Sequence, residues 1–193
     1  MRRVCVYAGS NPGNDLIYAQ AARELADLLA ERGIGLVYGG GRVGLMGVLA
    51  DTALAAGGEV IGVMPQALVD REIAHEGLTE LRVVASMHER KALMAELSDA
   101  FVAVPGGIGT LEELIEIYTW SQLGIHAKPC GVLNVDGYYD HLAAFLDHAV
   151  AAGFLKAEHR AVLSVASEPG ELLERLAAYV PRTVAKWTEL EAS

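Results

Sequence analysis

Residues 105–113 read Pro-Gly-Gly-Ile-Gly-Thr-Leu-Glu-Glu and combine glycines, a hydroxyl and carboxylates in nine positions. A continuous apolar segment, residues 100–104, precedes them, as a buried parallel strand requires. Leu114 and Tyr118 then follow at helical spacing. Glycines at such a strand–helix junction let a ligand approach the backbone, and the first helical turn offers unpaired N–H groups to an anion. The stretch is therefore predicted to bind a phosphate group.

The carboxylates in this stretch have two interpretations. Thr110 and Glu113 have the Thr-x-x-Glu spacing of a helix capping box, in which both side chains bond backbone N–H groups at the helix start. The other interpretation is that these residues form part of a ligand-binding site together with the glycines. Because a capping box does not require three glycines in front of it, we favour the ligand site and retain the cap as the alternative.

A second candidate cluster is residues 86–91, which read Ser-Met-His-Glu-Arg-Lys and begin another predicted helix with capping-box spacing. Arg90 shares its helical face with the apolar residues of 93–97. A guanidinium on an apolar stripe is unusual, and a cation in the first turn opposes the helix dipole. Either Arg90 extends from the helix edge to water, or Arg90 and Lys91 face an anionic ligand.

The two clusters together resemble the LOG ("Lonely Guy") family of cytokinin riboside 5′-monophosphate phosphoribohydrolases, long mislabelled as lysine decarboxylases. Its signatures, Met-His-x-Arg-Lys and Pro-Gly-Gly-x-Gly-Thr-x-x-Glu, are complete here at residues 87–91 and 105–113. The resemblance extends from about residue 4 to about residue 179. It implies a hydrolase that cleaves the N-glycosidic bond of adenosine 5′-monophosphates, including N6-modified ones, and releases cytokinin or adenine and ribose 5-phosphate.

The resemblance also implies particular site residues, with Arg90 and Glu113 as the catalytic pair. The residues expected to bind the nucleotide are Glu72, Lys91, Gly106, Gly107, Ile108, Gly109, Thr110, Leu111, Glu112 and Thr119. Glu72 and Thr119 rest on the resemblance alone: the charged segment around Glu72 is otherwise typical of a solvated loop, and the spacing of Thr119 indicates a packing residue. No cofactor and no metal are expected, and the ligand is a nucleoside monophosphate.

Two other classes of function stay open. A protein of the same fold could bind a nucleotide or a molybdenum cofactor without turnover, but such a carrier has little need for a carboxylate such as Glu113 beside the sugar. A decarboxylase that uses pyridoxal phosphate needs a lysine for the Schiff base and room for the cofactor. Lys91 is better explained as a contact to an anion, so the decarboxylase is the weakest of the three.

A third glycine-rich segment, residues 39–47, formally contains the Gly-x-Gly-x-x-Gly pattern of dinucleotide-binding proteins at Gly39, Gly41 and Gly44. That fingerprint also requires an acidic residue at the carboxyl end of the next strand, where it holds a ribose hydroxyl. Here Glu59 stands at the opposite end, before the strand 60–63. The segment is compatible with a nucleotide loop but argues against a nicotinamide site.

Strands and helices alternate along the chain, which predicts an α/β fold: a single Rossmann-like, doubly wound parallel sheet with helices on both faces. The expected strands are residues 3–8, 36–38, 60–63, 82–85, 100–104, 129–135 and 162–165. We expect one nucleotide-binding catalytic domain, residues 1–180, followed by a tail, residues 181–193. The segment 39–47 is expected to be loop, with a helix after it to about residue 56.

Composition narrows the partners. The 193 residues are 52% hydrophobic and carry a formal charge of −10. This negative charge disfavours binding to nucleic acid, and it means that local groups must hold any anionic substrate. Without a membrane-spanning or signal-like apolar segment, the protein is expected in the cytoplasm and not at a membrane. Cys5 and Cys130 are expected as buried free thiols. The family resemblance implies a homodimer, and the large apolar side chains along residues 111–123 favour the same prediction.

Overall fold

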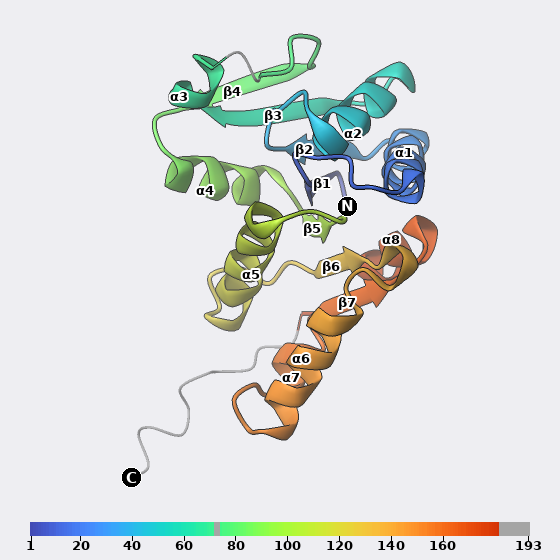
Figure 1. The fold of residues 1–193 in the computed structure, drawn as a ribbon. Helices are drawn as coiled ribbons and strands as arrows, with labels where there is room; N and C mark the ends of the chain where they lie inside the picture. Colours follow the sequence, from blue (N-terminus) through green and yellow to red (C-terminus); the bar gives the residue numbers. More distant parts are fainter. Residues whose placement is uncertain (72–73, 182–193) are drawn as a thin grey trace.

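Seven parallel strands form one sheet in the computed structural model, which describes residues 1–71 and 74–181 (Figure 1). Their order across the sheet is β4-β3-β2-β1-β5-β6-β7. The strands are β1 (Arg3–Tyr7), β2 (Gly35–Tyr38), β3 (Val60–Pro65), β4 (Glu80–Val84), β5 (Ala100–Ala103), β6 (Cys130–Leu133) and β7 (Leu163–Ala166). The α-helices are α1 (Leu16–Glu31), α2 (Gly44–Ala55), α3 (Gln66–Val69), α4 (Met87–Leu97), α5 (Ile108–Gln122), α6 (Asp140–Ala151), α7 (Ala157–Arg160) and α8 (Pro169–Ala177), and a short 3-10 helix, η1 (Val135–Gly137), precedes α6.

Helices cover both faces of the sheet. Helices α1, α2 and α8 pack on one face, and α4, α5 and α6 pack on the other (Figure 1). Strand β1 supplies both cores in alternation, with Val4 and Val6 on the first face and Cys5 and Tyr7 on the second. Strands buried on both sides need continuous apolar sequences, which is why the strand predictions succeeded at the centre of the sheet. The predicted doubly wound parallel fold is confirmed.

Helix boundaries follow local signals where those signals are strong. Helix α1 begins after Asp15, whose carboxylate accepts the N–H of Ile17 at 3.0 Å, and ends before Gly33, which has a φ of +64°. Helix α2 begins at Gly44, so the prediction that residues 44–47 are loop was wrong. The four-residue helices α3 and α7 were not predicted, because so short a segment carries almost no periodicity.

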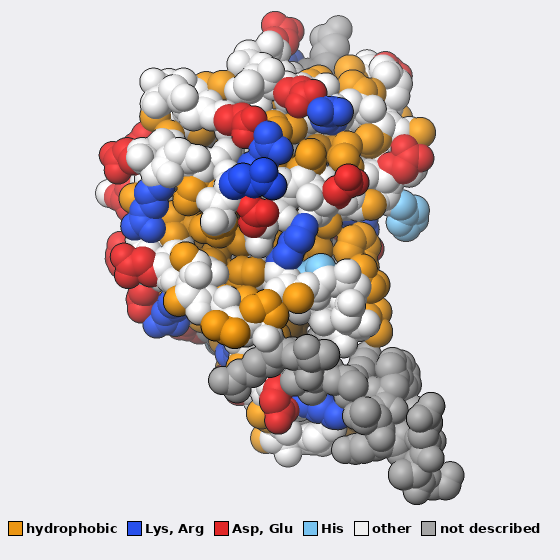
Figure 2. All heavy atoms as spheres, turned by 180° about the vertical axis from the view of Figure 1, so that it is seen from behind, with side chains coloured by type: hydrophobic (Ala, Val, Ile, Leu, Met, Phe, Trp, Pro, Cys, Tyr) orange, Lys and Arg blue, Asp and Glu red, His pale blue; other side chains and the backbone are white. Residues whose placement is uncertain are grey.

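Charged side chains of both signs lie on the surface (Figure 2), although the whole chain carries a formal charge of −10. Figure 2 shows acidic and basic side chains interspersed over the face that it presents. Cys5 and Cys130 are buried free thiols, as predicted. Among the described residues, no helix combines the length and the apolar character needed to cross a membrane. Of the predicted tail, only Pro181 lies within the described residues.

Candidate active site

Three glycine-containing turns meet at the carboxyl edge of the sheet, after β1, β2 and β5. The N–H of Gly9 donates to the carbonyl of Pro105 at 3.3 Å, and the N–H of Leu45 donates to the carbonyl of Gly9 at 2.9 Å. A Cβ atom on Gly106 would lie 2.8 Å from the Gly9 nitrogen, so the turns approach more closely than a side chain permits. Because β1 lies between β2 and β5, this is the switch point of the sheet, where such folds bind ligands.

A cavity of ≈ 250 Å³ opens at this switch point, bounded by the turns after β1 and β5 and by two tyrosines. The Tyr138 hydroxyl donates a hydrogen bond to the Gly106 carbonyl at 2.6 Å. The ring of Tyr18 packs edge-on against the ring of Tyr138, with the ring centroids 5.7 Å apart. Tyr138 therefore fixes one side of the predicted phosphate loop. Sequence reasoning did not single it out, because it stands 32 residues from Gly106 and no motif contains it.

Helix α5 starts with its amide groups at the glycine-rich loop. Its N-cap is Gly107, no side chain caps it, and Thr110 lies buried in its first turn. Glu113 lies further along the same helix, so the capping-box alternative for Thr110 and Glu113 was wrong. The N–H groups of residues 108–110 have no carbonyl partner within the helix and carry the positive end of its dipole. The arrangement therefore forms a potential binding site for a monoanion or dianion the size of a phosphate group.

Arg90 is held from several sides beneath this edge. Its Nε donates to the Val63 carbonyl at 3.0 Å and its Nη2 to the Gly39 carbonyl at 3.3 Å, while Nη2 lies 3.6 Å from Oε1 of Glu113. Only 9% of the residue is exposed, so the alternative that Arg90 extends to water was wrong. The capping box at the start of α4 is partly confirmed, because Ser86 Oγ accepts the N–H of Glu89 at 3.1 Å.

Burial sets the protonation behaviour of Glu113. Desolvation raises the pKa of this carboxyl above its ordinary value, and the charge of Glu112 raises it further. The Arg90 guanidinium acts in the opposite sense but does not cancel the effect of burial. A raised pKa brings a carboxylate closer to the range in which it accepts protons efficiently, so Glu113 has the properties of a general base.

Lys91 has close carboxylate partners on α5. Its Nζ lies 2.5 Å from Oε1 of Glu112 and 3.0 Å from Oε2 of Glu116. Burial alone would lower the pKa of Lys91, but the bonds to these two carboxylates outweigh it and raise that pKa. The predicted contact between Lys91 and a phosphate stays a prediction, and such a contact would compete with both glutamates.

The remaining predicted residues are spread along α5 or lie outside the described chain. Ile108 is largely exposed at the start of α5, and Leu111 packs partly into the core beneath it. Thr119, six positions beyond Glu113, donates its hydroxyl to the Ile115 carbonyl at 2.7 Å. Its proposed contact with the ligand stays untested. Glu72 lies outside the described residues.

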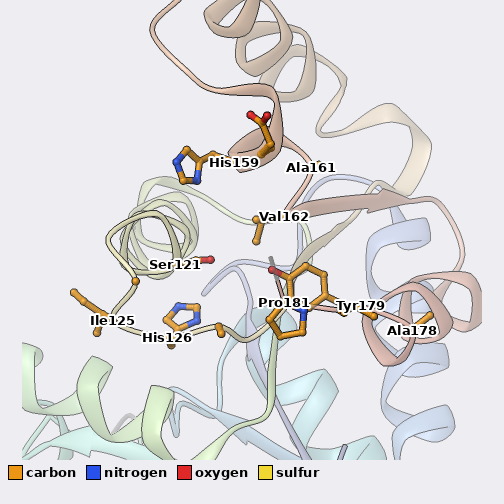
Figure 3. A pocket seen from close by; sticks show the side chains of 13 residues that line it. Ser121, Ile125, His126, His159, Ala161, Val162, Ala178, Tyr179 and Pro181 are labelled. Atoms are coloured by element: carbon orange, nitrogen blue, oxygen red, sulfur yellow. The ribbon is translucent and has the colours of Figure 1, made fainter. Parts of the chain in front are cut away.

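A second cavity, of ≈ 660 Å³, lies at the opposite edge of the sheet, among segments that precede β6 and β7. Figure 3 shows His126 and His159 on its walls, together with Ser121 of α5. The ring of His126 is engaged within the protein: Nε2 lies 2.8 Å from the Ile117 carbonyl, and Nδ1 accepts the N–H of Lys128 at 3.1 Å. None of the predicted site residues that the structure describes lines this cavity, so the switch-point edge remains the candidate site.

Comparisons with known proteins point in one direction. The family model described as "Possible lysine decarboxylase" matches residues 46–176. The probable cytokinin riboside 5′-monophosphate phosphoribohydrolase LOGL1 of Oryza sativa subsp. japonica is 51% identical over 195 residues, which cover 97% of this chain and 87% of that protein. Cytokinin riboside 5′-monophosphate phosphoribohydrolase LOG1 of Arabidopsis thaliana is 51% identical over 181 residues. The alignment covers 94% of this chain and 85% of that protein.

Solved structures are similar at much lower sequence identity. The crystal structure of TM1055 has a TM-score of 0.72 at 23% identity and covers 93% of this chain and 100% of that one. The molybdenum cofactor carrier protein of Chlamydomonas reinhardtii has a TM-score of 0.68 at 22% identity. The match covers 92% of this chain and 99% of that one. At this identity both similarities concern the fold alone.

Proposed function

Because the chain belongs to the LOG family of cytokinin riboside 5′-monophosphate phosphoribohydrolases, we propose that Glu113 and Arg90 form its catalytic pair. The protein is accordingly a hydrolase of N-glycosidic bonds, and its substrates are cytokinin riboside 5′-monophosphates. The observation that supports the catalytic assignment is the 3.6 Å approach of Arg90 Nη2 to Oε1 of Glu113 beside the start of α5.

The chemistry assigns different work to the two residues. As the C1′–N bond breaks, its electron pair leaves with the base and positive charge develops on the ribose, which a nearby carboxylate stabilises. Glu113 supplies that carboxylate and accepts a proton from the water that attacks C1′. Arg90 is fixed by the carbonyls of Val63 and Gly39, so it holds the carboxylate in place and orients the ribose or the water.

The phosphate of the nucleotide is proposed to lie against the backbone of residues 107–110. Support comes from the start of α5, whose first amides lie at the carboxyl edge of the sheet, and from the adjoining cavity that Tyr138 lines. A nucleotide in this position places its sugar toward the first two turns of α5, where Glu113 lies. The base then extends away from the phosphate loop, so the loop itself does not select the base.

A decarboxylase mechanism fits the site poorly. A Schiff-base lysine must lose its proton before it can attack a carbonyl group, which a lowered pKa favours. The bonds from Lys91 to Glu112 and Glu116 raise its pKa instead and favour the protonated ammonium. Lys91 is therefore a poor candidate for a covalent nucleophile.

A panel of nucleotides tests the proposed function. Adenosine 5′-monophosphate, N6-prenylated adenosine 5′-monophosphate and the monophosphates of other bases should be incubated separately with the enzyme, and free base and ribose 5-phosphate quantified. We expect the two products in equal amounts from adenine nucleotides. Free base in the absence of ribose 5-phosphate would contradict hydrolysis of the N-glycosidic bond.

We also propose that the enzyme is a homodimer that pairs through the exposed side of α5. Large apolar side chains are exposed along this helix and just beyond it, at Ile108, Ile115, Leu123 and Ile125. Exposed apolar residues that cluster on one element are typical of an interface between protein chains. Pairing there would bring a second copy close to the proposed site on the same helix.

Sedimentation velocity tests the dimer. At micromolar concentration the sedimenting species should have about twice the 20.5 kDa mass of one chain. Leu123→Glu should shift the equilibrium toward the monomer, because burying a charge in the interface costs free energy. Phe154→Glu is the matched control, since Phe154 is exposed in the turn after α6. A single 20.5 kDa species of the unmodified protein would contradict pairing.

A further inference from the structure

His75 joins three parts of the chain beside the proposed site. Its Nε2 lies 2.9 Å from Oδ1 of Asp51 on α2, and its Nδ1 accepts the N–H of Gly77 at 3.0 Å. Its backbone N–H donates to the carbonyl of Gly40 at 2.9 Å. Because Nδ1 accepts a hydrogen bond, the proton of the neutral ring resides on Nε2, which donates it to Asp51.

The Gly40 carbonyl belongs to the turn that also holds Arg90. Gly40 has a φ of +77°, and the carbonyl before it, that of Gly39, accepts from Nη2 of Arg90 at 3.3 Å. A bridge between Gly41 and Ala74 fastens the same turn to the segment that carries His75. The turn is thus bonded on one side to Arg90 and on the other to His75, so a shift at one side moves the acceptor at the other.

Close packing makes the position of this turn matter. A Cβ atom on Gly39 would lie 1.9 Å from Nη2 of Arg90, so the backbone and the guanidinium are in direct contact. Arg90 Nη2 in turn lies 3.6 Å from Oε1 of Glu113. A contiguous path therefore leads from Asp51 and His75 through the turn to the proposed catalytic pair.

We propose that His75, anchored by Asp51, is a positioning residue for the hydrolysis: it fixes the turn of residues 39–41, whose Gly39 carbonyl holds Arg90 against Glu113. The inference rests on the proposed roles of Arg90 and Glu113. His75 acts through the backbone and does not touch the substrate. No sequence pattern marks it, since Asp51, Gly40 and His75 come from separate segments that the fold brings together.

A double-mutant cycle on kcat tests this inference. His75→Ala should lower kcat by about tenfold, well within the roughly hundredfold loss that a misplacement of 1 Å can cause. In an Arg90→Lys background the same substitution should change kcat by less than about twofold, because residues that act as a unit are not additive. Asp51→Ala should reproduce the effect of His75→Ala, and Asp51→Asn, which keeps an acceptor oxygen, should restore most of the activity.

Thr79→Val is the matched control for local stability. Thr79 lies in the same β3–β4 connection, and its hydroxyl accepts the N–H of Val60 at 3.0 Å, so the variant weakens that connection without touching the turn. All variants should be assayed at a temperature at which circular dichroism shows them folded. The control should keep the kcat of the unmodified enzyme.

Specific outcomes would overturn the inference. If His75→Ala and Asp51→Ala melt at lower temperature but keep the full kcat when folded, their role is structural. If His75→Ala costs the same factor in both backgrounds, it does not act through Arg90. If Arg90→Lys or Glu113→Gln alone is fully active, the result contradicts the proposed catalytic roles of these residues. The positioning role of His75, which depends on those roles, is then contradicted as well.

Discussion

Glu113→Gln is expected to lower the turnover of nucleoside monophosphates by about 10²–10⁴-fold, the range that positioned acid–base groups contribute. Glutamine keeps the size and polarity of the side chain but can neither carry the negative charge that stabilises the ribose nor accept a proton. The measurement is steady-state base release with purified protein. Glu96→Gln, an isosteric change at an exposed position of α4, is the control and should retain activity. Activity that persists in Glu113→Gln would contradict the catalytic assignment.

The same variant has a defined effect on stability. The folded-state pKa of Glu113 is raised above its ordinary value of 4.5, chiefly by burial. A raised pKa means that this carboxyl contributes stability below pH 4.5, which is lost as the pH rises through the folded-state pKa. Glu113→Gln should therefore melt no lower than the unmodified protein at neutral pH, and any advantage should disappear in acid. A clear loss of stability at neutral pH would indicate a structural role.

The pH profile should report the same group. Because the ionised carboxylate is the active form, kcat/KM should rise with pH through the pKa of Glu113 in the free enzyme. The midpoint should lie above 4.5, the ordinary value for glutamate. A profile with its acidic limb at or below that value would show that another group controls the rate.

Removal of the substrate's phosphate is expected to have the second large effect. The protein carries a formal charge of −10, so it repels anions except where local groups attract them. The start of α5, where the N–H groups of residues 108–110 have no carbonyl partner within the helix, provides such a place. Charge-assisted contacts are worth about 1.5–3 kcal/mol each, so the loss of two should lower kcat/KM by about two to four orders of magnitude.

Matched substrate pairs measure this effect. Base release from adenosine should be compared with that from adenosine 5′-monophosphate, and an N6-modified riboside with its own monophosphate. Diphosphates and triphosphates should also react poorly, because the N-terminal turn of α5 at residues 107–110 is expected to fit one phosphate group. Equal turnover of nucleoside and monophosphate would mean that the start of α5 is not a phosphate site.

The sequence was most informative where a function depends on consecutive residues. The strand, glycine loop and helix around residues 105–113 could be predicted together, because each signal is local. The same holds for the central strands, whose apolar runs reflect burial on both faces. The family followed from two complete motifs. The boundary between domain and tail, the absence of nucleic-acid binding and the cytoplasmic location stay predictions.

Contacts between distant segments were beyond sequence reasoning. Nothing in the spacing of Arg90 decides between a path to water and a bond to the carbonyls of Val63 and Gly39, since that depends on how α4 packs on the sheet. Lys91 looked free to hold a phosphate, yet α5 places Glu112 and Glu116 against it. Tyr138 and His75 reach the edge of the site from elements that no motif connects to it.

One product analysis tests the central claim, that the Arg90–Glu113 site hydrolyses the nucleotide. The unmodified enzyme and Glu113→Gln should be incubated side by side with an N6-modified adenosine 5′-monophosphate, and free base and ribose 5-phosphate followed by chromatography. We predict equimolar base and ribose 5-phosphate from the unmodified enzyme and at least a roughly hundredfold slower release of both from the folded variant. Equal rates from the two proteins, or base released without ribose 5-phosphate, would contradict the claim.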